Sequence, residues 1–246
     1  MKLSFDSVTV VGCGGIGTWL VPPLARILAC QGFKGPVHLW DGDKYEEGNA
    51  NRQEFAPAHL GVNKAEAMAN VVRASHPVLD VVDHREFVLP DNVDQAVAEY
   101  GLMVTCLDNN PARALIEGAA RKLRNVCVLS AGNELMHGNV HVLIRRDGKD
   151  ATQPLLLRHP EVGTDKRGDR IDGCERLIEE GETQLLTTNF MAAASVLFAL
   201  HLLCTHGERA DGRKQETVPQ EIWFGIWDGI NVVPVFKGKE AEPCRS

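Results

Sequence analysis

A glycine-rich hexapeptide near the start of the chain is the first group of residues whose types and spacing point to chemistry. Gly12-Cys13-Gly14-Gly15-Ile16-Gly17 lies between a β-branched run at 8–11 and a stretch at 14–29 that reads as a helix. A glycine turn in that position lets the backbone approach a phosphate and points helix N–H groups at it. Gly12, Gly14, Gly15 and Gly17 therefore predict a nucleotide-binding turn, although without a ligand the same pattern is an ordinary tight turn.

Polar residues follow at the ends of later predicted strands. Asp41 closes the strand at 37–40, where an acidic side chain can accept hydrogen bonds from ribose hydroxyls. The other members of the set are Asp43, Asn49, Arg52, Gln53, Lys64 and Asp108. Cations, amides and a distant carboxylate at the carboxyl ends of parallel strands suit a polyphosphate whose negative charge rises during displacement, with the carboxylate holding Mg²⁺. Each residue alone could be a solvated group or a helix cap, but the ordered set predicts a polyphosphate site.

The elements that must position these residues alternate between strand and helix. Strands are expected at 8–11, 37–40, 80–88, 102–107, 126–130 and 140–144, and helices at 14–29, 64–75 and 111–123. Pro22-Pro23 is expected to bend the first helix or to end its first turn early. The alternation predicts an α/β fold of the Rossmann-like, doubly wound type, in which a mostly parallel sheet carries helices on both faces.

The second half of the chain departs from this pattern. The segment 145–175 is polar, glycine-punctuated and aperiodic, and it predicts a long mobile crossover loop with Cys174 at its end. An apolar helix is expected at 187–206, and its run at 190–204 is too short to cross a membrane, which favours a buried helix. The segment 222–236, with its Asp228-Gly229 turn, predicts a hairpin that forms a C-terminal antiparallel extension. We treat 1–246 as a single domain.

Composition limits the partners and the compartment. The chain has 246 residues, of which 44% are hydrophobic and 24% charged, as in soluble globular proteins. Its net charge of −7 argues against binding DNA or another nucleic acid as the main purpose. Seven cysteines without a CxxC pair, and a first segment unlike a signal peptide, favour a reducing cytoplasm and no membrane anchor. His137 and His159 lack metal-ligand spacing and are interpreted as ordinary loop histidines.

Taken in order, these motifs resemble the ThiF/MoeB superfamily, which includes the adenylating domain of ubiquitin-activating enzymes. The shared pattern is GxGGxG, then DxD, an Asn, an Arg-Gln pair, a Lys and an Asp that closes a strand. Phe55-Ala56-Pro57 and Ala131-Gly132-Asn133 are among the features that make the chain most similar to the compact bacterial ThiF family proteins of PRTRC plasmid systems. The resemblance covers most of the chain and implies a ThiF-like adenylation domain.

The resemblance also implies an activity. The enzyme would be an adenylyltransferase of the ubiquitin-like-protein activating type, which uses ATP and Mg²⁺ to adenylate the C-terminal glycine of a ubiquitin-like or ThiS-like sulfur-carrier protein that ends in diglycine. By position, Asp41 would bind the ribose and Asp108 would bind Mg²⁺. Asn49, Arg52 and Lys64 would hold the phosphates and stabilise the charge of the transition state. Asp43 and Gln53 would line the same pocket.

A second step and further partners follow from the same resemblance. Cys174 falls where ThiF-type proteins carry a catalytic cysteine, and it would take the acyl group as a thioester or join in sulfur transfer. A conjugating-enzyme-like or sulfur-transfer partner and a homodimer are expected. With few residues before the first strand, the arginine that relatives lend to the partner subunit is not expected there, and Arg145 or Arg146 is the substitute considered.

Three other functions fit parts of the pattern. The branch of the same superfamily that dehydrates threonylcarbamoyladenosine in tRNA has a similar Asn-Arg-Gln stretch, but a tRNA-binding enzyme should carry a basic face. A nicotinamide-dependent oxidoreductase would use the glycine turn and Asp41 and would leave Arg52, Lys64 and Asp108 without a task. A catalytically inactive scaffold that docks a ubiquitin-like partner would not need those three residues either.

Overall fold

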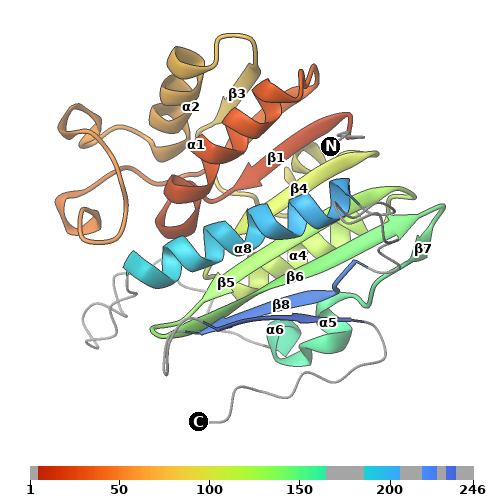
Figure 1. The fold of residues 1–246 in the computed structure, drawn as a ribbon. Helices are drawn as coiled ribbons and strands as arrows, with labels where there is room; N and C mark the ends of the chain where they lie inside the picture. The colour runs from red at the N-terminus through yellow and green to blue at the C-terminus, as the bar shows by residue number, and fades with distance from the viewer. Residues whose placement is uncertain (1–4, 165–185, 206–217, 226–230, 237–246) are drawn as a thin grey trace.

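The structure is a computed structural model that describes residues 5–164, 186–205, 218–225 and 231–236. The described strands join in one nine-stranded sheet with the order β3-β2-β1-β4-β5-β6-β8-β9, and β7 pairs with β6. The strands are β1 (Ser7–Val11), β2 (Pro36–Trp40), β3 (Asp80–His84), β4 (Gly101–Cys106), β5 (Val126–Asn133), β6 (His137–Arg146), β7 (Lys149–Asp150), β8 (Glu221–Gly225) and β9 (Asn231–Val235). Figure 1 shows the sheet with helices on both of its faces.

The first five strands form the parallel half of the sheet. In the central strand β1, Val8 lies opposite Val37 of β2 on one side and Leu102 of β4 on the other. These strands are short β-branched and apolar runs, as is usual where a parallel strand is buried on both faces. Their carboxyl ends lie at one edge of the sheet, and β2, β1 and β4 lead directly into the segments that carry the predicted site. The predicted Rossmann-like fold is confirmed.

The antiparallel half begins at β6, earlier than the predicted C-terminal hairpin. The strand β6 runs antiparallel to both β5 and β8, and β8 pairs with β9 in the register Glu221↔Val235 to Gly225↔Asn231. The predicted pairing of the last two strands is therefore confirmed. The predicted Asp228-Gly229 turn lies outside the described residues.

Helices bury the two faces of the sheet separately. One face packs against α1 (Gly15–Cys30), α2 (Lys64–Ser75) and α8 (Leu186–Cys204), and the other packs against α3 (Val93–Ala96) and α4 (Asn110–Ala120). Successive residues of β1 divide between the two layers, because Val10 belongs to the first cluster and Val11 to the second. The helix α1 continues through Pro22 and Pro23, so the expectation that they end its first turn early is wrong.

The segment expected to be a long irregular loop at 145–175 is largely ordered in its first two thirds. The strand β6 extends to Arg146, β7 follows at once, and α5 (Leu155–Arg158) and α6 (Pro160–Thr164) pack close to α4. Elements this short carry no periodic pattern in a sequence, which is why the prediction failed there. The remainder of that segment, with Cys174, lies outside the described residues.

The helix α8 is the longest described helix, and its sequence is mostly apolar. By length and hydropathy it is the one described helix that could cross a membrane, and 44% of its most apolar window is buried inside the protein. One side of it packs on α1, β5 and β6. Phe190 and Phe198 are 46% and 42% exposed, although Phe190 stacks on Trp19 of α1, so the expectation of a buried helix holds only in part.

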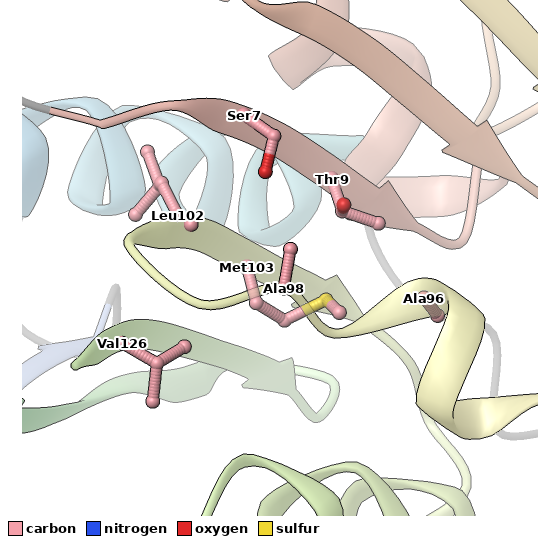
Figure 2. A pocket seen from close by; sticks show the side chains of 8 residues that line it. Ser7, Thr9, Ala96, Ala98, Leu102, Met103 and Val126 are labelled. Atoms are coloured by element: carbon pink, nitrogen blue, oxygen red, sulfur yellow. The ribbon is translucent and has the colours of Figure 1, made fainter. Parts of the chain in front are cut away.

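A small pocket lies near the amino-terminal ends of the strands. Ser7 and Thr9 of β1, Leu102 and Met103 of β4, and Val126 of β5 line it together with alanines of the α3 region, as Figure 2 shows. Its lining holds no charged side chain. It lies at the opposite end of these strands from the glycine turn.

Candidate functional site

The glycine turn joins β1 to α1 at the carboxyl edge of the sheet, and its geometry requires glycine. Gly12 has a φ of +94°, and a Cβ there would lie 2.5 Å from the carbonyl oxygen of Cys106. A Cβ on Gly17 would lie 2.0 Å from the carbonyl oxygen of Gly12. The turn is therefore pressed against β4 and against the first turn of its own helix. No side chain caps α1 at Gly14, so the N–H groups of its first turn can receive an anion.

Asp41 links the end of β2 to this turn. Its Oδ2 accepts a hydrogen bond of 2.7 Å from the backbone N–H of Cys13, and its Oδ1 accepts one of 2.9 Å from the backbone N–H of Asp43. Burial raises the pKa of this carboxyl above its usual value, and the ammonium of Lys64 offsets part of that effect. Each carboxylate oxygen has a second lone pair, so the predicted contact with ribose hydroxyls remains geometrically open.

Lys64 and Asp43 form the next contact of the site. The Nζ of Lys64 lies 3.3 Å from Oδ2 of Asp43, and Lys64 is 7% exposed although it is a lysine. Asn63 holds the loop that carries Asp41 and Asp43 in place. Its Nδ2 donates to the carbonyl oxygen of Asp41 over 2.8 Å and to that of Asp43 over 3.0 Å. Its Oδ1 also caps α2 by accepting from the N–H of Glu66. Sequence analysis missed Asn63, although its place directly before the helix is a typical N-cap signal.

Arg52 and Gln53 are brought to the glycine turn by α1. Thr18 donates to the carbonyl oxygen of Glu54 over 2.5 Å, and Trp19 Nε1 donates to that of Arg52 over 3.1 Å. Arg52 is 5% exposed, and its guanidinium contacts the carbonyl oxygen of Gly48 at 3.3 Å. A Cβ on Gly14 would lie 3.5 Å from Nε2 of Gln53.

Asn49 and Asp108 lie at the periphery of the candidate site, in the segments that follow β2 and β4. Asn49 Oδ1 accepts from the N–H of Glu46 over 3.1 Å, which orients its amide. Asp108 is exposed, follows the carboxyl end of β4, and precedes Asn109, which caps α4 by accepting from the N–H of Ala112. In the described part of the chain no three His, Cys, Asp or Glu side chains gather as metal ligands. A single carboxylate still fits Mg²⁺, which takes its other ligands from phosphates and water.

The structure thus brings the glycine turn, Asp41, Asp43, Lys64, Arg52 and Gln53 into one hydrogen-bonded neighbourhood and places Asp108 at the same edge of the sheet. Cys174 lies outside the described residues. Arg145 lies at the opposite edge, where its guanidinium contacts Asp150 and its Nε donates to the carbonyl oxygen of Leu123. Arg145 and the adjacent Arg146 therefore cannot supply an arginine to the nucleotide site of their own subunit.

A second buried polar group lies on the antiparallel half of the sheet. Glu221 of β8 is fully buried and accepts from Arg158, from Asn139 over 2.5 Å, and contacts His159 Nε2 at 2.7 Å. The hydrogen bond to Glu221 raises the pKa of His159 above its usual value. His159 lies in the loop between α5 and α6, as expected, but it is not an ordinary loop histidine, because its contact with the buried Glu221 joins the end of α5 to β8. His137 is the first residue of β6, so the expectation that it lies in a loop is wrong.

Comparison with known proteins identifies the family of this chain, and comparison with solved structures identifies its fold. The model of the ThiF family matches residues 1–223. The adenylyltransferase and sulfurtransferase MOCS3 of Xenopus laevis is 33% identical over 137 residues, which are 55% of this chain and 28% of that protein. MOCS3-2 of Zea mays is 34% identical over 131 residues, or 53% of this chain and 26% of that protein. The chain thus spans about a quarter of the length of these curated relatives.

Solved structures show the same fold at low identity. The structure of E. coli MccB with ATP aligns with a TM-score of 0.68 and 20% identity over 98% of this chain and 66% of that one. PaaA aligns with a TM-score of 0.65 and 22% identity over 96% of this chain and 65% of that one. At these identities the likeness is one of fold.

Proposed function

This chain belongs to the ThiF family, and we propose that it is an ATP-dependent adenylating enzyme for the C-terminal glycine carboxylate of a ubiquitin-like or sulfur-carrier protein. The observation that carries the proposal is the hydrogen-bonded connection of Lys64, Asp43 and Asp41 to the glycine turn. The names of the relatives agree with it, since MOCS3 is an adenylyltransferase and sulfurtransferase and MccB has been solved with ATP and with AMPCPP and MccA.

In the proposed reaction one oxygen of the carrier's terminal carboxylate attacks the α-phosphorus of ATP. The bond between the α-phosphorus and the oxygen that bridges to the β-phosphorus breaks, pyrophosphate leaves, and the acyl group remains as a mixed anhydride with AMP. This step needs no covalent catalyst, because alignment of the reactants and stabilisation of the developing charge suffice. Lys64 and Arg52, both buried, supply the positive charge, and Asp41 positions the ribose.

Asp108 is the proposed ligand of Mg²⁺. When bound, Mg²⁺ neutralises charge on the phosphate oxygens and holds them in line for displacement. The chain's own part is to present one exposed carboxylate at the end of β4, beside the glycine turn. Asn109 fixes the start of α4 directly after it and so fixes the backbone that carries this carboxylate.

Cys174 is proposed for a second step, in which its thiolate attacks the acyl carbon, AMP leaves, and a thioester forms. Such a thioester would serve a conjugating-enzyme-like or sulfur-transfer partner. Each described cysteine is a free thiol, and burial raises the pKa of Cys13, Cys106 and Cys127. Burial also raises the pKa of Cys204 to about 11, so these four are poor nucleophiles at neutral pH. Cys30 is the last residue of α1, at the far end of that helix from the glycine turn, and the proposal therefore assigns the step to Cys174.

ATP–pyrophosphate exchange with a panel of small proteins that end in diglycine tests the function. Exchange is expected only with a carrier, is expected to fall by at least about 100-fold in Asp108→Asn, and is expected to survive in Cys174→Ala, because the thioester step comes later. Asp80→Asn, at the amino-terminal end of β3, is the matched control for the lost charge and should exchange normally. ATP binding without exchange for any carrier would contradict the proposal and direct attention to the tRNA-modifying branch or to a scaffold.

A further inference from the structure

Asn189 is a buried amide that sits against the glycine turn and that none of the family motifs includes. It lies in the first turns of α8 and is 0% exposed. A Cβ on Gly15 would lie 3.0 Å from its Oδ1 and 3.1 Å from its Nδ2, so the amide lies directly on the first residue of α1. Glycine at position 15 is therefore what lets this amide approach the turn.

The orientation of this amide is fixed by its neighbour on β5. Asn133 Nδ2 donates to Asn189 Oδ1 over 3.1 Å and to Thr188 Oγ1 over 3.2 Å. Because Oδ1 of Asn189 faces the donor of Asn133, Nδ2 of Asn189 points away from it. The structure gives Nδ2 no acceptor. A buried donor without a partner is costly and needs an explanation.

Two helix N-termini meet at the same place. The helices α1 and α8 both begin at the edge of the sheet where β1 and β5 end, and they pack side by side (Figure 1). Each is longer than four turns, and each directs the positive end of its dipole toward this edge. On the other side of the turn the buried amide of Gln53 lies against Gly14. The N–H group of Asn189 without a partner thus lies beside the N-termini of two helices, whose dipoles favour a bound anion.

We infer that Asn189 is a phosphate-binding residue, whose Nδ2 donates to a non-bridging oxygen of the nucleotide's phosphate chain at the start of α1. The inference rests on the proposed function, because it assigns a further contact to the same nucleotide. A phosphate oxygen fits better than a neutral peptide carbonyl of the carrier, since the helix dipoles favour negative charge. The contact also connects the last parallel strand to the glycine turn, because Asn133 of β5 holds Asn189 in place.

The test compares the affinities of ATP and adenosine, measured by calorimetry, in Asn189→Asp and Asn189→Leu. Aspartate keeps the shape and the acceptor for Asn133, but it replaces the N–H donor by a negative charge. We expect the Kd of ATP to rise roughly 10- to 100-fold, as for loss of a hydrogen bond to a charged group, while the Kd of adenosine stays unchanged. Leucine should give a smaller rise, because it removes the donor without adding charge. Asn70→Asp, at an exposed position of α2, is the control for the added charge.

Several outcomes would overturn the inference. Equal losses for ATP and adenosine would mean that Asn189 has only a structural role. An unchanged Kd of ATP with a raised KM for the carrier would assign the donor to the carrier's tail. A wild-type protein that binds neither ATP nor tripolyphosphate would also overturn it. Specific weakening of ATP binding in a protein that exchanges with no carrier would support the phosphate contact and refute the proposed adenylation, so the two failures are distinguishable.

Discussion

The carboxylate of Asp41 and the backbone N–H of Cys13 are joined by a hydrogen bond of 2.7 Å, and this contact connects the end of β2 to the glycine turn after β1. The other oxygen of the same carboxylate holds the N–H of Asp43, whose side chain contacts Lys64. One acidic side chain therefore fixes both the phosphate-binding turn and the loop that carries a site cation. Its role in the architecture is as direct as its proposed contact with ribose.

Asp41→Asn is expected to weaken ATP binding by about 10-fold or more, because an amide has only one acceptor oxygen for the two N–H groups that now bind the carboxylate. One of those N–H groups would face an amide donor, and the charge beside Lys64 would be lost. Titration calorimetry with ATP measures the effect. Asp80→Asn serves as the control for charge, and wild-type affinity in Asp41→Asn would show that the contact is dispensable.

Gly17→Ala is expected to destabilise the protein by about 3 kcal/mol or more, because its Cβ would lie 2.0 Å from a backbone oxygen that cannot move without the whole turn. Gly118→Ala is the matched control at an exposed position of α4, where a Cβ meets nothing within 4 Å. It should stabilise by about 0.5–1 kcal/mol through helix propensity and lower backbone entropy in the unfolded chain. Urea unfolding measures both, and similar values for the two variants would refute the steric argument.

Trp19→Phe is expected to slow ATP–pyrophosphate exchange by roughly 3- to 10-fold while costing only about 1 kcal/mol of stability. The change removes the hydrogen bond from Nε1 to the carbonyl oxygen of Arg52 but keeps an aromatic ring against Phe190, whose ring centroid lies 4.1 Å away. Phe190→Leu is the complementary control, because it removes the stacking and keeps the hydrogen bond. If Phe190→Leu slows exchange as much as Trp19→Phe does, stacking rather than the hydrogen bond positions Arg52.

The parallel half of the fold could be predicted well from the sequence, because short continuous segments are enough to identify its strands. β-branched runs that end in Gly12, Asp41 or Asp108 identify buried strands and, at the same time, the edge where their chemistry lies. The residues that orient the site could not be predicted in this way. Trp19 holds Arg52 from 33 positions away, and Asn133 of β5 orients Asn189 of α8. Asn189 reaches the turn from an apolar helix late in the sequence, where nothing marks it. The ion pair of His159 with Glu221 was missed for the same reason, since 62 positions separate its members.

That ion pair makes the stability of the antiparallel half dependent on pH. Burial by itself would raise the pKa of Glu221, but hydrogen bonds from His159 and Arg158 lower it to about 2. His159 in turn has a raised pKa, from its hydrogen bond to Glu221 and despite its burial, with Glu161 adding to the effect. The neighbouring His141 is buried and neutral, because burial lowers its pKa to about 4.

Linkage between protonation and folding gives the direction in which each group changes the stability as the pH changes. The stabilisation by His159 is complete below the usual histidine pKa and is lost as the pH rises through the raised pKa of the folded state. The stabilisation by Glu221 is present above the usual glutamate pKa and is lost only as the pH falls toward 2. His141 acts in the opposite direction to His159, because the unfolded chain takes up its proton first, so stability falls as the pH drops from the usual histidine pKa toward 4.

His159→Gln is therefore expected to destabilise the protein more at about pH 6 than at about pH 9, because glutamine can keep a hydrogen bond to Glu221 but never carries the charge. Free energies of unfolding from urea titrations at the two pH values measure the difference between wild type and variant. His201→Gln, on the exposed side of α8, is the control and should have the same small effect at both. A His159→Gln variant whose loss is as large at the higher pH as at the lower one would show that the imidazole is held by Glu221 without its proton.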